Sequence, residues 1–170
     1  MRPLILKTAR MLTDCMDAKF GLVKMDENRI EYKLLDAILT DDMARAALKM
    51  GVRKPTTPEE LAKKLRWPVD KTKALLDEMA DIGIIEYNRH NNDRHKQYVL
   101  PIFVVGSAEN IMLNKKLLQK LGSLAPQFFY DMSLEPLKLI SHMVPPGAAG
   151  LGFHVIPVER AIPKTAKRST

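Results

Sequence analysis

The stretch from residue 57 to residue 103 constrains the fold more than any other part of the chain. It reads TPEELAKKLRW, then a single proline, then VDKTKALLDEMADIG. The segment IIEYNRHNNDRHKQYVLPIF follows directly. Thr57 with Glu60 three residues later is typical of a capping box, and Pro58 suits the first helical position. The stretch therefore predicts a helix that begins at a well-defined residue.

A break, a second helix and a hairpin are predicted next. Trp67-Pro68 ends the first helix, because the residue before a proline is disfavoured in helical backbone. Residues 84–87 and 97–105 have the composition of two strands, and residues 88–96 form a polar loop between them. The second helix is expected to end at Gly83 and to bury five apolar side chains: Val69, Leu75, Leu76, Met79 and Ile82. Helix, turn, helix and hairpin in this order predict a winged helix-turn-helix.

Helices are also predicted on both sides of this region. Apolar periodicity indicates helices over residues 4–16 and 29–39, and Thr40 is a capping residue for a third helix that ends at Gly51. Beyond the hairpin we expect one helix over 107–121, and two short helices within 127–143 that are separated by Pro136.

The expected fold is therefore mainly α with a small β-hairpin: a winged helix-turn-helix with N- and C-terminal helical extensions. We expect four parts along the chain. They are an N-terminal helix and linker (1–28), the winged helix-turn-helix domain (29–106), a helical extension with a Gly/Pro turn and a short strand at 153–158 (107–163), and a basic disordered tail (164–170).

Composition narrows the classes of function. Cys15 is the only cysteine, which excludes an intramolecular disulfide and disfavours a thiolate-held metal site within the chain. No apolar run approaches the about 20 residues that span a bilayer, so we expect no membrane partner and a cytoplasmic location. The net charge of +7 is compatible with an anionic partner.

Ten basic residues are the candidate contacts to duplex DNA, and the alternative interpretation is that they form the solvated surface of a basic protein. The helix over 69–83 would read the bases, yet it holds two lysines and four acids, a net charge of −2. Phosphates would repel that helix, so the evidence for DNA comes from the basic residues around it and in the hairpin. The ten are Arg53, Lys54, Lys63, Lys64, Arg66, Lys71, Lys73, Arg89, Arg94 and Lys96.

No catalytic, cofactor-binding or metal site is predicted from the residues. His90 and His95 stand five apart in the polar loop, and we interpret them as solvated side chains rather than ligands. Residues 147–152 contain a G-x-x-G-x-G run, but an apolar strand is expected after it, where a phosphate-binding loop needs a helix. We interpret these glycines as turn residues.

Two segments resemble a known family. DDMARAALKMGVRKPTTPEELAKKL (41–65) and VPPGAAGLGFHVIPVERAI (144–162) are similar to the N-terminal region of anaerobe FAD- and iron-sulfur-dependent NAD(P)H oxidoreductases. In that family a winged-helix-like segment precedes ferredoxin-type clusters and a flavin and nicotinamide domain. The cluster cysteines and the G-x-G-x-x-G fingerprint do not occur among these residues. The resemblance therefore implies FAD and 4Fe-4S clusters on a partner or in fused relatives.

Two functions follow as expectations. The first is a non-catalytic winged-helix accessory domain or subunit of an iron-sulfur flavin oxidoreductase, which acts as a protein-interaction module. The alternative is a winged-helix transcription regulator that binds duplex DNA as a homodimer, with the helices over 4–16 and 107–121 pairing between chains.

Overall fold

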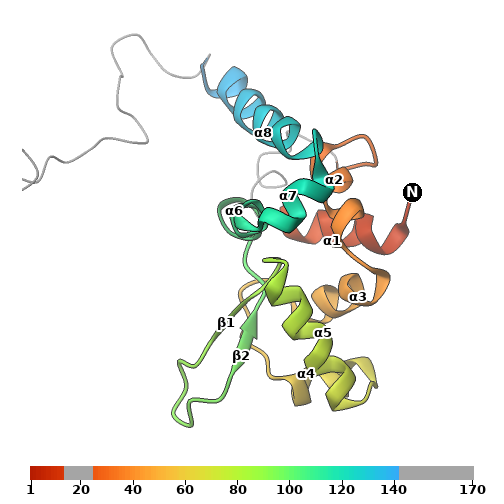
Figure 1. Cartoon of the computed structure of the whole chain (residues 1–170), viewed down its shortest axis with the longest axis vertical. Helices are drawn as coiled ribbons and strands as arrows, with labels where there is room; N and C mark the ends of the chain where they lie inside the picture. The colour runs from red at the N-terminus through yellow and green to blue at the C-terminus, as the bar shows by residue number, and fades with distance from the viewer. Residues whose placement is uncertain (14–24, 142–170) are drawn as a thin grey trace, which may run out of the picture. The chain divides into compact units, whose positions relative to one another are not determined.

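A computed structural model describes residues 1–13 and 25–141 (Figure 1). The chain divides into two units, Met1–Asp131 and Met132–Thr170, and each is considered on its own. The first unit is mainly helical with a two-stranded antiparallel hairpin, as expected from the sequence. The expected Gly/Pro turn, the strand at 153–158, the basic tail and Cys15 lie outside the described residues.

Three helices form the N-terminal part of the first unit: α1 (Pro3–Thr13), α2 (Ile30–Ile38) and α3 (Asp41–Met50). The helix α1 packs against both α2 and α3. Ile5 and Leu12 of α1 are fully buried, and the small side chains of Ala44 and Ala47 on α3 are buried too. Small residues allow two helices to approach closely, so the alanines of α3 admit the apolar face of α1.

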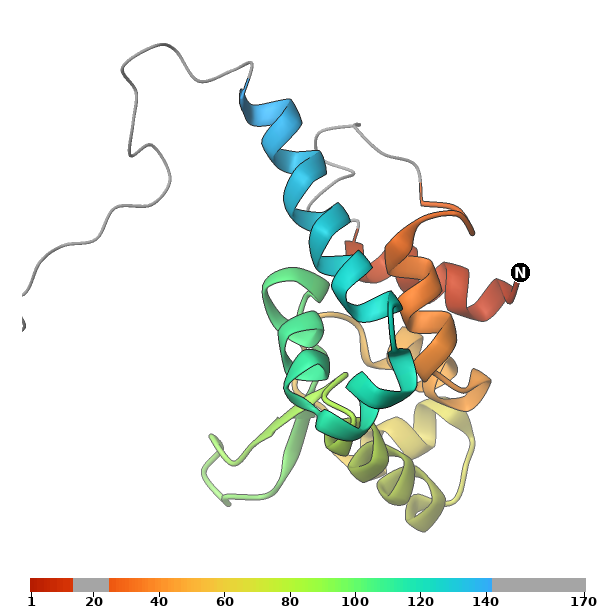
Figure 2. The same ribbon diagram turned by 45° about the horizontal axis from the view of Figure 1, so that its top comes forward.

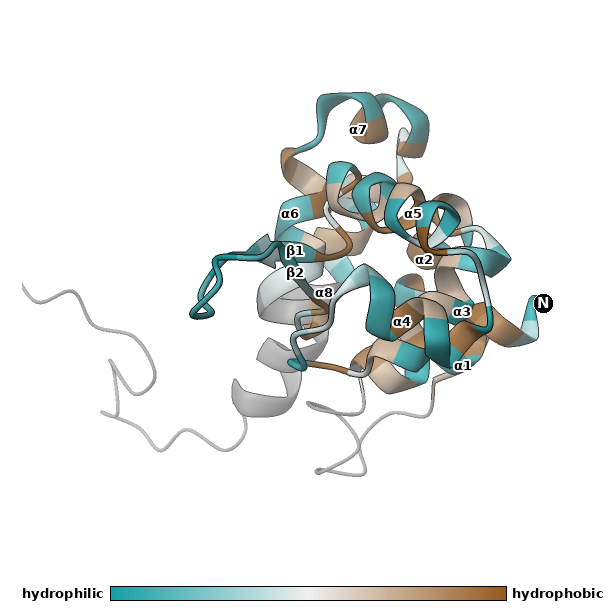
Figure 3. Cartoon of the chain, turned by 90° about the horizontal axis from the view of Figure 1, so that it is seen from below, coloured by the Kyte–Doolittle hydropathy of each residue, from teal (hydrophilic) through white to brown (hydrophobic). Residues whose placement is uncertain are grey.

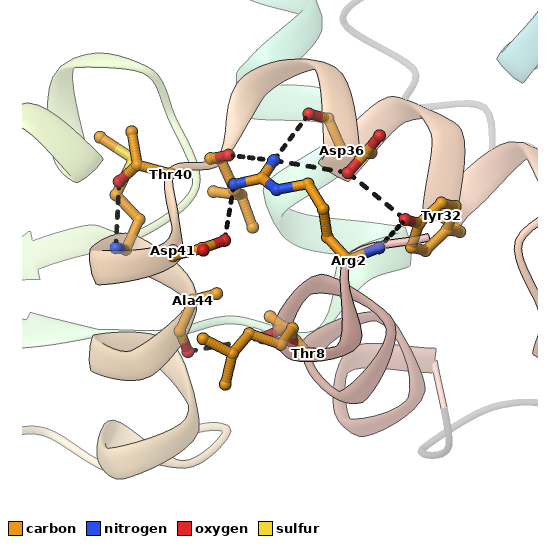
Figure 4. A network of polar contacts seen from close by, with 10 residues as sticks. Arg2, Thr8, Tyr32, Asp36, Thr40, Asp41 and Ala44 are labelled. Atoms are coloured by element: carbon orange, nitrogen blue, oxygen red, sulfur yellow. Dashed lines mark hydrogen bonds and ion pairs between the residues drawn. The ribbon is translucent and has the colours of Figure 1, made fainter.

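Arg2 joins the start of α1 to the end of α2 and the start of α3 (Figure 4). Its guanidinium donates to the carbonyl oxygen of Leu39 at 2.9 Å and to Oδ1 of Asp41 at 2.7 Å. Its backbone N–H donates to the hydroxyl of Tyr32 at 2.8 Å. Further along α1, the hydroxyl of Thr8 lies 3.4 Å from the carbonyl oxygen of Ala44. These contacts fix the relative positions of the three helices.

The predicted pair of helices is confirmed as α4 (Pro58–Leu65) and α5 (Val69–Asp81). The capping box forms as expected: Thr57 Oγ1 accepts from the backbone N–H of Glu60 at 3.3 Å, and Glu60 Oε2 accepts from that of Thr57 at 3.1 Å. The predicted core of this helix is only partly confirmed: Leu76 and Met79 are buried, whereas Leu75 and Ile82 are half-buried. Val69 is 42% exposed, because it occupies the first position of α5.

The hairpin is shorter than predicted. Its strands are β1 (Glu86–Asn88) and β2 (Gln97–Val99), with Tyr87 opposite Tyr98. Ile84 and Ile85 do not extend β1, because their backbone N–H groups bond to the carbonyl oxygen of Met79 and close the end of α5. Thr56 pairs with the other edge of β2 through two 2.9 Å backbone bonds to Tyr98.

The chain after the hairpin departs most from the prediction. Residues 103–105 were expected in a strand, but Phe103–Ser107 form a π-helical turn, η2. The single helix expected over 107–121 is two helices, α6 (Ala108–Leu113) and α7 (Lys115–Leu121). The break falls at Asn114, whose extended backbone ends α6 and whose side chain accepts from the N–H groups of Lys116 and Leu117.

The last described helix, α8 (Leu124–Ser141), is continuous, where two short helices were expected. Pro136 lies inside it. An interior proline removes its own N–H from the helical ladder and crowds the carbonyl group four residues earlier, but this cost is local and the hydrogen bonds on either side can maintain the helix. Within the first unit, Phe128 of α8 is buried and its ring meets that of Phe103 edge to face at 5.5 Å between centroids.

Helix α6 lies against the C-terminal end of α5. A Cβ atom added at Gly83, where φ is +81°, would lie 2.7 Å from the carbonyl carbon of Asn110. The buried hydroxyl of Ser107 donates to the carbonyl oxygen of Ile84 at 2.9 Å. The turn after α5 is thus held by a close backbone approach to α6 and a hydrogen bond from η2, and the hairpin extends away from α5 and α6 (Figures 1 and 2).

Candidate functional site

The exposed side of α5 is acidic, as the sequence predicted. Asp70, Glu78 and Asp81 are exposed along the helix, and Asp77 is partly exposed. Two lysines, Lys71 and Lys73, share this helix. Whether α5 can bind a nucleic acid therefore depends on whether these two lysines already interact with acidic residues of the same chain.

Lys71 is paired within the fold. Its ammonium lies 2.9 Å from Oδ2 of Asp42, which belongs to the first turn of α3. The same ammonium stands 4.2 Å from the centroid of the Trp67 ring. Sequence reasoning missed both contacts, because Asp42 is 29 residues away and only the packing of α3 beside α4 brings it near. Lys71 is thus a link between helices.

Lys96 is also paired within the fold. Its Nζ lies 2.5 Å from Oδ1 of Asp77, and the Tyr98 hydroxyl donates to the same oxygen at 2.6 Å. The hydrogen bond from Lys96, then that from Tyr98, lowers the pKa of Asp77 below its ordinary value. Conversely, the hydrogen bond to Asp77 raises the pKa of Lys96. Lys96, just before β2, and Tyr98, within β2, thus tie the hairpin to α5.

Lys73 lies near two carboxylates. Glu59 has a lowered pKa chiefly because its own backbone N–H and the Thr57 hydroxyl stabilise the ionised carboxylate, with weaker help from the charges of His95 and Lys73. The charge of Lys73 also contributes to the lowered pKa of Asp77. Lys73 is nevertheless exposed and forms no ion pair with a residue in the described ranges, so its charge remains on the surface of α5.

The seven other predicted contacts come from three separate segments. All seven are exposed, and no ion pair joins any of them to another residue in the described ranges. Arg89 and Arg94 lie in the hairpin loop, which is hydrophilic throughout (Figure 3). The others lie before α4 or at its C-terminal end: Arg53, Lys54, Lys63, Lys64 and Arg66. The structure thus places these cations around α5 rather than on it.

Two asparagine side chains hold the backbone at the hairpin histidines, and the N–H of His90 donates to Oδ1 of Asn88 at 3.2 Å. Asn91 accepts from the backbone N–H of His95 at 2.9 Å and donates to its carbonyl oxygen at 2.7 Å. Within residues 1–13 and 25–141, no group of three or more His, Cys, Asp or Glu side chains is arranged to hold a metal ion.

A groove between α1, α3 and α4 was not predicted. Its volume is about 830 Å³, and its lining consists of five apolar and five basic side chains. They are Leu4, Met11, Leu48, Leu65 and Trp67, with Lys7, Arg10, Arg45, Lys49 and Lys64. The sequence did carry a signal, because Lys7 and Arg10 are three apart and Arg45 and Lys49 four apart, spacings that share one helical face.

Comparisons with protein-family models, with curated proteins and with solved structures find no match for this chain. Among the helices of the described residues, none is long and apolar enough to cross a bilayer.

Proposed function

We propose that this chain is a non-catalytic winged-helix module that docks on an iron-sulfur flavoprotein oxidoreductase, as a separate subunit or as part of one polypeptide. The winged-helix assignment is supported by the order of α3, α4, α5, β1 and β2. It is also supported by Thr56, whose backbone pairs with Tyr98 of β2 on the edge away from β1, in the place of a short third strand. In this assignment α4 and α5 are the helix-turn-helix and the hairpin is the wing.

One observation carries the proposal of a protein partner rather than DNA. The exposed side of α5 presents Asp70, Glu78 and Asp81, while Lys71 is paired with Asp42 on α3. A helix entering the major groove needs cations and hydrogen-bond donors toward phosphates and bases, and this one offers mainly carboxylates. Its surface is better suited to a protein that supplies complementary charge.

The identity of the partner rests on the resemblance of residues 41–65 and 144–162 to flavin and iron-sulfur oxidoreductases. In this proposal FAD and the 4Fe-4S clusters belong to the partner, and the complex is cytoplasmic. The module supplies a docking surface and no catalytic residue.

The test is to capture the chain from its source cells under native conditions and to assay the complex for flavin fluorescence, iron and acid-labile sulfide. The proposal predicts all three in a fixed ratio to the chain. Recovery of the chain only at its own mass of 19.3 kDa, without flavin or iron, would contradict it.

A second candidate is a DNA-binding regulator that acts as a homodimer. It is favoured by the exposed cations Arg89 and Arg94 in the hairpin loop and by Lys63 and Lys64 on α4. A basic wing can follow phosphates or enter a minor groove even where the helix reads no bases. Changing Lys63, Lys64 and Arg94 to Glu would then weaken duplex binding steeply. Unchanged binding would rule this candidate out.

A further inference from the structure

The groove between α1, α3 and α4 has an apolar floor and a basic rim. Its apolar side chains are all half-buried, whereas its basic side chains are all exposed. Lys7 and Arg10 come from α1, Arg45 and Lys49 from α3, and Lys64 from α4. Three helices thus place five cations around one hydrophobic surface.

The rim charges are not balanced within the part of the chain that the structure describes. Among the described residues, no carboxylate lines the groove and none forms an ion pair with any of the five rim cations. Arg10 donates weakly to the carbonyl oxygen of Met25, at 3.4 Å, which leaves its charge uncompensated. Like charges on a shared rim repel one another, so an anionic occupant would lower the electrostatic free energy of this face.

We propose that the groove binds an acidic amphipathic helix of the partner protein. Its apolar side would cover Leu4, Leu48 and Trp67, and its carboxylates would meet the cations of the rim. Helix-in-groove recognition uses this combination of an apolar stripe and flanking charge. The inference rests on the proposed function for the identity of the partner, but not for the chemistry of the groove.

Other occupants fit less well. Duplex DNA would complement the rim but would leave the apolar floor against phosphates. Residues 14–24 of the chain hold two aspartates and two lysines, and residues 142–170 hold one glutamate and several basic residues, so neither segment is an acidic ligand. A second copy could offer the acidic side of its α5, but that head-to-tail contact leads to rings or filaments.

Trp67 makes the test direct, because it is the only tryptophan and it lines the groove. The full chain is titrated with a synthetic helix of about 18 residues that carries Leu at i, i+3, i+4 and i+7 and Glu elsewhere. Three further probes are a scrambled peptide of the same composition, sodium dodecyl phosphate and a random-sequence duplex. We expect a saturable change of Trp67 fluorescence with the patterned peptide and at least about tenfold weaker binding of the others.

Two matched variants locate the binding. Lys7→Glu with Arg45→Glu reverses the rim on two helices and should weaken peptide binding on the order of tenfold. Lys33→Glu with Lys115→Glu makes the same change of net charge on exposed residues of α2 and α7 outside the groove, and should leave binding unchanged. Lys7→Gln with Arg45→Gln gives a smaller loss, and circular dichroism confirms that each variant is folded.

The inference is overturned if the scrambled peptide, dodecyl phosphate or DNA binds as tightly as the patterned peptide, if both charge-reversal variants bind equally well, or if Trp67 responds only to self-association. Its failure is separable from that of the proposed function. A flavoprotein complex that forms equally with Lys7→Glu/Arg45→Glu sinks the groove proposal alone. Peptide binding without any flavoprotein complex sinks the partner assignment alone.

Discussion

Lys96 of the hairpin and Asp77 of α5 form an ion pair with 2.5 Å between Nζ and Oδ1. The two residues are 19 apart in the sequence and were expected to serve different surfaces, one as a DNA contact and the other as a repelling acid. Their pairing, with Tyr98 bonded to the same oxygen, turns both into structural groups. Charges that the sequence suggests are surface groups therefore serve in part to connect the hairpin to α5.

Asp77→Ala removes the acceptor of both Lys96 and the buried Tyr98. We expect the free energy of unfolding to fall by about 1–2 kcal/mol, because the buried Tyr98 hydroxyl loses its hydrogen-bond partner. This value is at the low end of the usual cost of an unpaired buried hydroxyl, since the Asp77 carboxylate is 42% exposed and water weakens its interactions. Urea denaturation followed by Trp67 fluorescence measures it. Glu78→Ala, an exposed neighbour on the same helix, is the control and should change stability by less than about 0.5 kcal/mol. Equal losses of stability in the two variants would contradict a structural role for the contacts of Asp77 with Lys96 and Tyr98.

The lowered pKa of Asp77 predicts a pH dependence. Because hydrogen bonds from Lys96 and Tyr98 favour the folded ionised form, the stabilisation is present above the ordinary aspartate range. It should be lost as the pH falls below the ordinary value of 3.8, through the folded-state pKa. Urea denaturation over a pH series should give a shallower acid loss for Asp77→Ala than for the unchanged chain. Identical slopes would show that Asp77 contributes nothing to acid sensitivity.

Gly83 is predicted to tolerate no side chain. Its φ of +81° strains an L-residue, and any Cβ would approach the Asn110 carbonyl carbon to 2.7 Å. Gly83→Ala should lower the free energy of unfolding by more than about 2 kcal/mol. Gly83→Asn separates the two causes, since asparagine accepts positive φ more readily but still carries a Cβ. Near-normal thermal stability of the asparagine variant would show that strain, not the approach to Asn110, sets the requirement for glycine.

Thr57→Ala should remove one half of the capping box. The N–H of Glu60 loses its acceptor at the start of α4, and we expect a loss of about 1 kcal/mol in the free energy of unfolding. Thr57→Ser keeps the hydroxyl and should recover most of that loss. If serine and alanine destabilise the chain equally in urea denaturation, the cap is not the source of the effect.

The parts of the fold that were predicted correctly depend on local chemistry. The start of α4 follows from Thr57, Pro58 and Glu60, and the end of α3 at Gly51 from a residue that adopts positive φ at no cost. The break at Asn114 was missed for a related reason. An asparagine within an amphipathic pattern can either continue the helix or use its side chain to cap a new one, and the apolar periodicity is the same in both cases.

The site was predicted less well because its features depend on tertiary packing. Lys71 and Lys96 could be recognised as cations from the sequence, but their partners Asp42 and Asp77 become neighbours only after folding. The groove is similar, since its cations are contributed by three helices that are separated along the chain. The acidic character of α5, by contrast, was predicted correctly, because it depends only on the residues within that helix.

The most direct test of a protein-docking role is the binding of the full chain to a labelled random duplex, measured by anisotropy at about 50 mM and about 200 mM salt. With Lys71 and Lys96 paired and α5 acidic, we predict weak binding at the lower salt concentration and negligible binding at the higher. Sub-micromolar binding that falls steeply between the two, by a dimeric chain, would contradict this account and favour the DNA-binding regulator.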